Sequence, residues 1–187
     1  MCVIIVKRAG FALPSKSILR KAYNVNHDGC GFVCKSLSYH SMDFEDFYKS
    51  LVKVPKKEAC IIHFRWATHG SVCISNCHPF HDDETGVWFA HNGILGITPV
   101  GDMTDSETAF RKKLVPALKK YGYESSKFSA AVMKIIGGSR FAFLKDGQVH
   151  LYGHFEEYGN CLYSNLRFLP WQEQVRRYHA SYDWRTA

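Results

Sequence analysis

Short apolar runs alternate with amphipathic segments along the chain, and this pattern predicts both strands and helices. Runs rich in β-branched and aromatic residues, bounded by glycine or polar residues, favour buried strands. The expected strands are residues 2–6, 29–35, 59–67 and 86–93. Two further alternating runs, within residues 139–153, meet at Asp146-Gly147, which is typical of a hairpin turn.

Other segments repeat apolar residues at helical spacing. Within residues 43–53, Phe44, Phe47, Tyr48 and Leu51 form one apolar face of a predicted helix. The remaining expected helices are about 14–23, 105–122 and 125–136, with Pro116 bending or dividing the second of these. A polar loop is expected between residues 67 and 86. Strand-rich stretches flank a helical block, so we expect an α+β fold with antiparallel sheets.

Length and composition narrow the class of protein. The chain has 187 residues, of which 46% are hydrophobic and 22% charged, as in ordinary globular proteins. No linker or repeat divides it, so residues 1–187 are expected to form a single domain. The aromatic and basic tail, about residues 165–187, is of uncertain role: it either docks a partner or packs on the core. The chain shows neither a signal peptide nor a membrane span, and a cytoplasmic location is expected.

Charge and cysteine content exclude other classes. Lys and Arg number 24 against 17 Asp and Glu, a net charge of +7, but the basic residues are scattered, so no nucleic-acid partner is expected. Seven cysteines, an odd number spread over the chain, argue against a disulfide framework. Most of them are expected to be reduced and buried.

The spacing of the cysteines and histidines does not favour a metal site. Cys73, Cys77, His78 and His81 lie within nine residues, and Cys30 and Cys34 form another pair. Structural zinc sites favour cysteines separated by two residues, whereas both pairs here are separated by three. No metal and no other cofactor is therefore expected.

Cys2 is the first candidate for chemistry. Removal of Met1 would leave one residue with both a thiol and a free α-amine, that is, a nucleophile and a base. An amine with a pKa near ~7.7 to 8.0 accepts the proton of a thiol with a pKa near ~8.5 at neutral pH. Position alone also fits a small residue that merely starts a strand.

Two strand ends carry polar residues suited to ligand binding. HFRWATHG places Arg65, Thr68 and His69 where a strand gives way to a turn, and arginine matches the geometry of a carboxylate. A surface ion pair is the alternative for Arg65. In FAHNGIL, the Asn92 amide and the Gly93 N–H follow a strand and are suited to bind a developing oxyanion, although Asn-Gly is often only a turn.

Six motifs occur in order: an N-terminal MC, then DGCGF, RWATHG, SNCHPF, FAHNGIL and TDSE. Together they closely resemble the class II glutamine amidotransferase domain of the N-terminal nucleophile hydrolase family. The resemblance covers Cys2 to Glu107. It implies an α+β fold of four layers, an αββα sandwich of two antiparallel sheets between helices.

The resemblance also implies catalytic roles. Cys2 would attack the side-chain amide of glutamine with its own amine as general base. Asn92 Nδ2 and the Gly93 N–H would hold the oxyanion. Ammonia would leave, and water would release glutamate from a γ-glutamyl thioester on Cys2.

Further residues would bind the substrate. By the same resemblance, Arg65 binds the α-carboxylate, assisted by Thr68 and His69, and Asp105 pairs with the α-ammonium. Trp66 is expected to cover the pocket or pack beneath it, with core packing favoured. His78 is interpreted as a packing and hydrogen-bonding residue that shapes its loop.

Family enzymes usually couple this domain to a synthase that consumes ammonia. A separate ammonia-accepting enzyme is therefore an expected partner, and no membrane is expected to be one. The alternatives are a stand-alone amidohydrolase acting on another γ-glutamyl amide, or an inactive binding module. An inactive binding module would not need all five of the residues to which the resemblance gives catalytic or substrate-binding roles: Cys2, Arg65, Asn92, Gly93 and Asp105.

Overall fold

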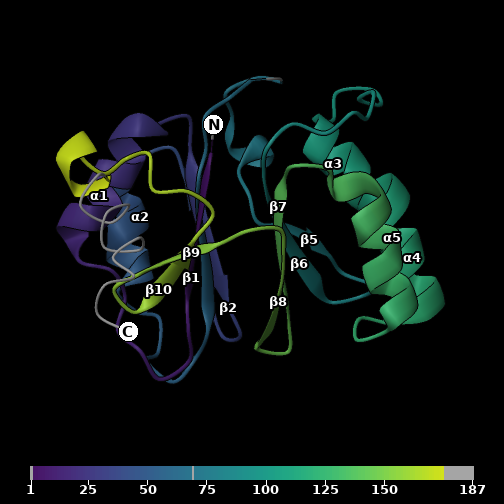
Figure 1. Ribbon diagram of the computed structural model, residues 1–187, viewed down its shortest axis with the longest axis horizontal. Helices are drawn as coiled ribbons and strands as arrows, with labels where there is room; N and C mark the ends of the chain where they lie inside the picture. Colours follow the sequence, from purple (N-terminus) through teal and green to yellow (C-terminus); the bar gives the residue numbers. More distant parts are fainter. Residues whose placement is uncertain (1, 69, 175–187) are drawn as a thin grey trace, which may run out of the picture.

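The computed structural model describes residues 2–68 and 70–174, in which two antiparallel sheets pack face to face (Figure 1). Helices α1 and α2 cover one sheet and α3 to α5 cover the other, which gives the predicted four layers. The larger sheet has the order β3-β2-β4-β1-β10-β9, and the smaller one β5-β6-β7-β8. Among the described residues, no helix is long and apolar enough to span a bilayer.

Strand β1 (Val3–Lys7) lies inside the larger sheet, where β4 (Cys60–Phe64) and β10 (Cys161–Tyr163) flank it. Ile5 is opposite Ile62 on one side and Tyr163 on the other. Every residue of β1 and β4 is buried, because the sheet is covered on both faces. The sheet therefore fixes the position of Cys2, which immediately precedes β1.

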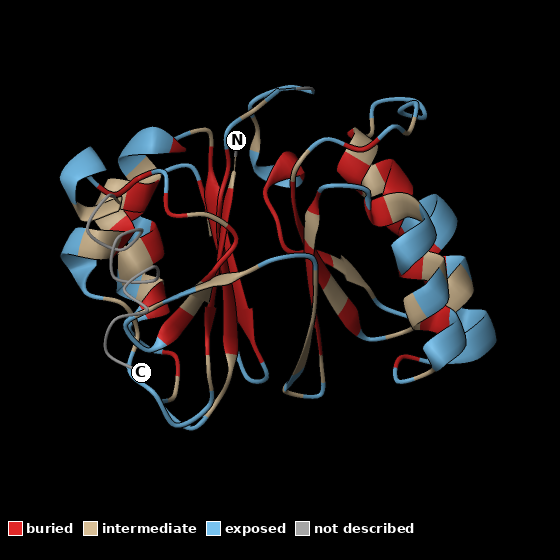
Figure 2. Ribbon diagram, viewed as in Figure 1, coloured by how far each residue is buried: buried red, intermediate tan, exposed pale blue. Residues whose placement is uncertain are grey.

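Three apolar clusters correspond to the three interfaces between the layers (Figure 2). Phe44, Phe47 and Phe64 belong to the cluster between the larger sheet and its helices. The cluster between the sheets is made of smaller aliphatic residues: Ile4, Val6, Val33, Ile61, Ala90, Ala142 and Leu144. Burial of such side chains stabilises the fold by about 25 cal/mol per Å² of apolar surface.

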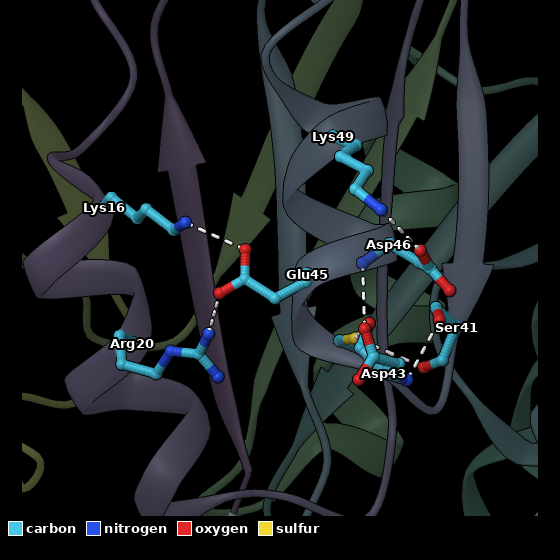
Figure 3. A network of polar contacts seen from close by, with 8 residues as sticks. Lys16, Arg20, Ser41, Asp43, Glu45, Asp46 and Lys49 are labelled. Carbon is cyan, nitrogen blue, oxygen red and sulfur yellow. Dashed lines mark hydrogen bonds and ion pairs between the residues drawn. The ribbon is translucent and has the colours of Figure 1, made fainter.

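Helices α1 (Lys16–Val25) and α2 (Phe44–Leu51) confirm two predictions. Ser15 and Asp43 cap them, and each side chain accepts a backbone N–H of the first turn. Glu45 of α2 pairs with Lys16 and Arg20 of α1 (Figure 3). These ion pairs are exposed and add little beside the buried aromatic contacts.

The predicted helix at 105–122 is divided. It consists of α3 (Asp105–Ala109), a π-helical segment η2 (Phe110–Leu114) and α4 (Val115–Tyr121), in which Pro116 lies in the first turn. The helical backbone continues through all three segments, and the Val115 N–H donates to the Phe110 carbonyl. The π-helical segment just before Pro116 accommodates a residue that cannot donate a backbone hydrogen bond. Helix α5 (Ser126–Ile136) begins after Ser125, as predicted.

The smaller sheet contains the predicted strand β6 (Val87–Asn92) and the hairpin of β7 (Arg140–Lys145) and β8 (Gln148–Tyr152). Asp146 and Gly147 both have positive φ, at 51° and 84°, as a tight hairpin turn requires. The predicted strand at 29–35 is β2 (Cys30–Cys34).

Several elements differ from the predictions. The segment expected to be a polar loop contains the 3₁₀ turn η1 (Ile74–Asn76) and β5 (Phe80–Asp82). Strands β3 (Ser38–Ser41) and β9 (Glu156–Tyr158) and the short β10 were not predicted. In the tail, Leu166, Phe168 and Leu169 are buried in the core, while residues 175–187 lie outside the described part of the chain.

Candidate active site

One pocket brings together most of the predicted site residues. Cys2 from the start of β1, the segment that follows β4, the turn after β6 and the N-terminus of α3 all line it. Its lining is Cys2, Arg65, Trp66, Ala67, Thr68, Asn76, His78, His91, Gly93, Thr104, Asp105 and Ser106. Asn92 is the one predicted site residue in the described part of the chain that does not line it, and His69 lies outside that part.

The Cys2 thiol lies against the backbone of Trp66. The Trp66 N–H donates to Cys2 Sγ at 3.4 Å, and the thiol is 3.5 Å from the Trp66 carbonyl oxygen. The Cys2 carbonyl accepts a hydrogen bond from Asn165 Nδ2 at 2.9 Å. Burial raises the pKa of the thiol, an effect that the Trp66 N–H and the Arg65 charge oppose. A base that takes the thiol proton is therefore needed to form the thiolate at neutral pH.

Arg65 is almost fully buried, with 3% of its surface exposed, although it follows the end of β4. Its Nη1 donates to the Ser71 carbonyl at 3.0 Å, and Asn76 Nδ2 donates to the same oxygen at 2.9 Å. Gly70 lies between Arg65 and Thr104, and a Cβ there would be 2.9 Å from Thr104 Cγ2. The loop after Gly70 thus holds a guanidinium beside the pocket in a geometry that suits a carboxylate.

Asn92 ends β6 and Gly93 follows it, but the two residues have different neighbours. Gly93 lines the pocket, with φ at 147°, and an added Cβ would be 2.2 Å from Ser139 Oγ. Asn92 is buried, and its Nδ2 donates to Ser164 Oγ at 2.8 Å. Asn92 Oδ1 has no hydrogen-bond partner among the described residues. In this arrangement the amide donor faces Ser164, whereas an oxyanion-binding role requires it to face the substrate.

Asp105 is the first residue of α3, after the N-cap Thr104. Its Oδ1 accepts the Ser106 N–H at 2.8 Å, and its Oδ2 accepts the Leu95 N–H at 3.1 Å. Oδ1 also accepts the Ser106 hydroxyl at 3.3 Å. These bonds fix a carboxylate at the pocket wall, and Oδ2, with one hydrogen bond, keeps a further lone pair for a cation. His91 Nδ1 lies 2.7 Å from Ser106 Oγ and so extends this polar wall.

Three buried histidines lie at the pocket: His78 and His91 line it, and His63 packs against His78. The rings of His63 and His78 are 4.4 Å apart, and His78 is also 4.4 Å from the Phe80 ring. Burial lowers the pKa of His63 to about 3 and that of His91 to about 4, and it holds the pKa of His78 well below its usual range. All three are therefore neutral near pH 7.

Two expectations for side chains near the site need correction. Trp66 is not a core residue: 42% of its surface is exposed, and it covers the side of the pocket next to Cys2, because β4 ends at Phe64. His78 packs as expected, but neither ring nitrogen has a hydrogen-bond partner in the described ranges. The residue is joined to Pro79 by a cis peptide bond.

Several polar residues near the site were not predicted. Four of them line the pocket and lie within the sequence motifs described above: Asn76, His91, Thr104 and Ser106. Their place in these motifs was the signal that could have identified them. Ser164 and Asn165 contact Asn92 and Cys2, but no motif marks them. Within residues 2–68 and 70–174, no group of three or more His, Cys, Asp or Glu side chains is placed to hold a metal ion. All seven cysteines are free, and five are buried.

Residues 49–172 match the model of the family described as class-II glutamine amidotransferases. This range includes the residues from Arg65 to Asp105 that line the pocket, but not Cys2. A segment of 33 residues is 48% identical to glutamine–fructose-6-phosphate aminotransferase (isomerizing) from Methanococcus maripaludis; it covers 18% of this chain and 6% of that protein.

Two solved structures have a similar fold. One is a glutamine phosphoribosylpyrophosphate amidotransferase from B. subtilis complexed with ADP and GMP, with a TM-score of 0.55 and 17% identity. The other is described as the allosteric regulatory enzyme of purine biosynthesis, with a TM-score of 0.56 and 17% identity. Each comparison covers 87% of this chain but only 41% of the solved one. Because the family model matches well over half of the chain, this protein belongs to the class-II glutamine amidotransferases, a family of enzymes.

Proposed function

We propose that this protein hydrolyses the side-chain amide of glutamine to glutamate and ammonia through a thioester on Cys2. The observation that carries the proposal is the pocket in which the Cys2 thiol, the Arg65 guanidinium, the Asp105 carboxylate and the Gly93 backbone meet. These groups match the four needs of the reaction: a nucleophile, two sites for the charged ends of an amino acid, and an oxyanion donor.

Substrate binding rests on Arg65 and Asp105. The buried guanidinium offers paired N–H groups to an α-carboxylate, and the fixed carboxylate of Asp105 accepts from an α-ammonium. Thr68 lines the same pocket and is proposed to assist, as is His69. Binding of both charges selects substrates that carry an α-ammonium and an α-carboxylate group, and it leaves the side-chain amide to face Cys2.

The chemical step begins once Met1 is removed. The α-amine of Cys2 takes the thiol proton, and the thiolate sulfur attacks the amide carbon, whose oxygen becomes an oxyanion. The Gly93 N–H and the Asn92 amide stabilise that oxyanion. The C–N bond then breaks, and the leaving nitrogen takes the proton from the ammonium of Cys2 and departs as ammonia. Water, deprotonated by the same amine, hydrolyses the thioester and frees glutamate.

The fate of ammonia is the second part of the proposal. This chain spans 41% of the length of the solved structures that it resembles, and one of those is a phosphoribosylpyrophosphate amidotransferase. We propose that ammonia passes to a separate acceptor enzyme. The alternative is a stand-alone amidohydrolase that acts on another γ-glutamyl amide.

A substrate panel tests the proposal. Purified protein is given glutamine, γ-glutamyl amides, and amides that lack the α-amino or α-carboxylate group, with and without proteins that co-purify from the source cell. Glutamine and γ-glutamyl amides should react, since a substrate that lacks one of the two charges loses its charged contact with Arg65 or with Asp105, at a cost of about 2 to 5 kcal/mol. If amides that lack the α-amino or α-carboxylate group react at a rate comparable to that of glutamine, the roles proposed for Arg65 and Asp105 are contradicted. Preference for a different γ-glutamyl amide, with no response to co-purified proteins, would favour the stand-alone hydrolase.

A further inference from the structure

Two consecutive residues after β10, Ser164 and Asn165, connect the nucleophile to the oxyanion site. The Ser164 N–H donates to the Ile4 carbonyl at 2.9 Å, and the Ile4 N–H donates to Ser164 Oγ at 2.8 Å. Asn165 Nδ2 donates to the Cys2 carbonyl at 2.9 Å. The same Ser164 hydroxyl accepts from Asn92 Nδ2 at 2.8 Å. Ser164 is 2% exposed, so water does not compete freely for these bonds.

The hydrogen bonds around Ser164 are incomplete in this arrangement. A serine hydroxyl has one proton to donate and two lone pairs. In the described part of the chain the Ser164 hydroxyl accepts two hydrogen bonds and donates none. At the same time, Asn92 Oδ1 is buried without a donor. An unsatisfied acceptor lies on the very amide that the hydroxyl contacts, and leaving such a group unpaired is costly.

Rotation of the Asn92 amide by about 180° removes this mismatch, since the terminal torsion of asparagine is broad and roughly two-fold. The Ser164 hydroxyl then keeps the Ile4 N–H and donates its proton to Asn92 Oδ1. Asn92 Nδ2 is released from Ser164 and becomes available to another acceptor. The oxyanion next to Gly93 is the acceptor that forms during the reaction described above.

We infer that Ser164 is a positioning residue for the reaction: it holds Asn92 Oδ1 in the active orientation so that Nδ2 is directed to the oxyanion. The inference rests on the proposed function, because it needs Asn92 to stabilise the transition state. Ser164 itself touches neither substrate nor reacting atoms. Its effect should therefore appear in kcat, with KM for glutamine little changed, and it should vanish when the Asn92 amide is absent.

A double-mutant cycle on the full chain tests this inference, with glutamate release measured at saturating glutamine. Asn92→Ala should lower kcat by about 10²- to 10³-fold, as for loss of one oxyanion donor. Ser164→Ala should lower it about five- to tenfold, as for one neutral hydrogen bond, and should have no further effect in the Asn92→Ala background. Ser164→Thr keeps the hydroxyl and should recover most of the loss.

Asn165→Ala is the matched control, because Asn165 contacts Cys2 and not Asn92. Its effect on kcat should multiply with that of Asn92→Ala. Thermal unfolding reports whether each variant is folded, and Ser164→Cys, with a thiol of similar size, replaces Ser164→Ala if the latter does not fold. If Ser164→Ala lowers kcat in the Asn92→Ala background as much as it does in the wild type, the inference about Ser164 is wrong, while the proposed function is unaffected. If the wild type does not hydrolyse glutamine, or Asn92→Ala is as active as wild type, the proposed function fails first and the inference with it.

Discussion

Gly93 combines a backbone conformation and a close contact that other residues do not accept. Its φ of 147° disfavours any side chain, and a Cβ would be 2.2 Å from Ser139 Oγ. Gly93→Ala should therefore lower the free energy of unfolding by at least about 2 kcal/mol and reduce activity, because the backbone of Gly93, which lines the same pocket as Cys2, moves.

Gly96→Ala is the control for this prediction, since no atom lies within 4 Å of a Cβ at Gly96. Urea unfolding and glutamate release are measured for both variants. Equal stability of the two variants would mean that the turn after β6 is not constrained as described.

Arg65 offers a second prediction for a single residue. Arg65→Lys keeps the charge but loses the planar fork, so KM for glutamine should rise more than about tenfold while kcat changes less. Arg111→Lys is the control, because Arg111 pairs with Glu107 on an exposed face of α3 and η2. Steady-state kinetics decides the matter, and an unchanged KM for Arg65→Lys would exclude a bidentate contact to the substrate.

At the level of elements, Lys7 ends β1 and is buried with 1% of its surface exposed. Its Nζ donates to the carbonyls of Pro55, Lys56 and Glu58 at 3.1, 2.7 and 2.5 Å. Lys7→Met keeps most of the length of the side chain but leaves these oxygens without their donor, and should destabilise the fold by about 1 to 3 kcal/mol.

The control for Lys7 is Lys49→Met, because Lys49 is exposed and its ion pair, with Asp46, lies at the surface. Denaturant midpoints should separate the two variants clearly. A Lys7→Met variant as stable as Lys49→Met would show that the carbonyl contacts do not hold the end of β1 that lies opposite to Cys2.

Strands and helices were predictable where a local pattern determines them. Strands β1 and β4 are covered on both faces of the sheet, and their sequences are therefore largely apolar runs. The hairpin of β7 and β8 was predictable because Asp-Gly favours a tight turn. Strands β5, β9 and β10 have only three residues each. Strand β5 pairs with the next strand, β6, and β9 pairs with β10, whereas β10 also pairs with the distant β1. No periodicity can show in so short a segment.

The same reasoning explains which site residues were predictable. Cys2, Arg65, Gly93 and Asp105 belong to recognisable motifs, and the fold brings them to one pocket. Ser164 reaches Asn92 only because β10 pairs with β1, a contact between residues 160 positions apart. The orientation of the Asn92 amide depends on that contact and has no counterpart in the local sequence.

At the level of the whole molecule, the buried histidines predict how stability depends on pH. The pKa values of about 3 for His63 and 4 for His91 lie below the ~6.5 expected when unfolded. Between these values the unfolded state binds more protons, so stability is retained above about pH 6.5 and lost as pH falls toward 4. The loss should be on the order of a few kcal/mol in urea unfolding.

His78→Phe tests the origin of this pH dependence. The ring nitrogens of His78 have no partner among the described residues, so replacement leaves no other group unsatisfied. Because burial holds the pKa of His78 well below its usual range, the variant should lose less stability than wild type between pH 6.5 and 4.5. An identical slope for the two proteins would show that His78 does not contribute.

The central claim is that Cys2, freed of Met1, carries a γ-glutamyl thioester during turnover. Intact mass spectrometry of protein from its native cell, quenched in acid during reaction with glutamine, tests this most directly. The account predicts a mass that begins at Cys2 and a second species heavier by one glutamyl group, which is absent in Cys2→Ala. A protein that retains Met1 and still hydrolyses glutamine, or a Cys2→Ala variant that is fully active, would contradict it.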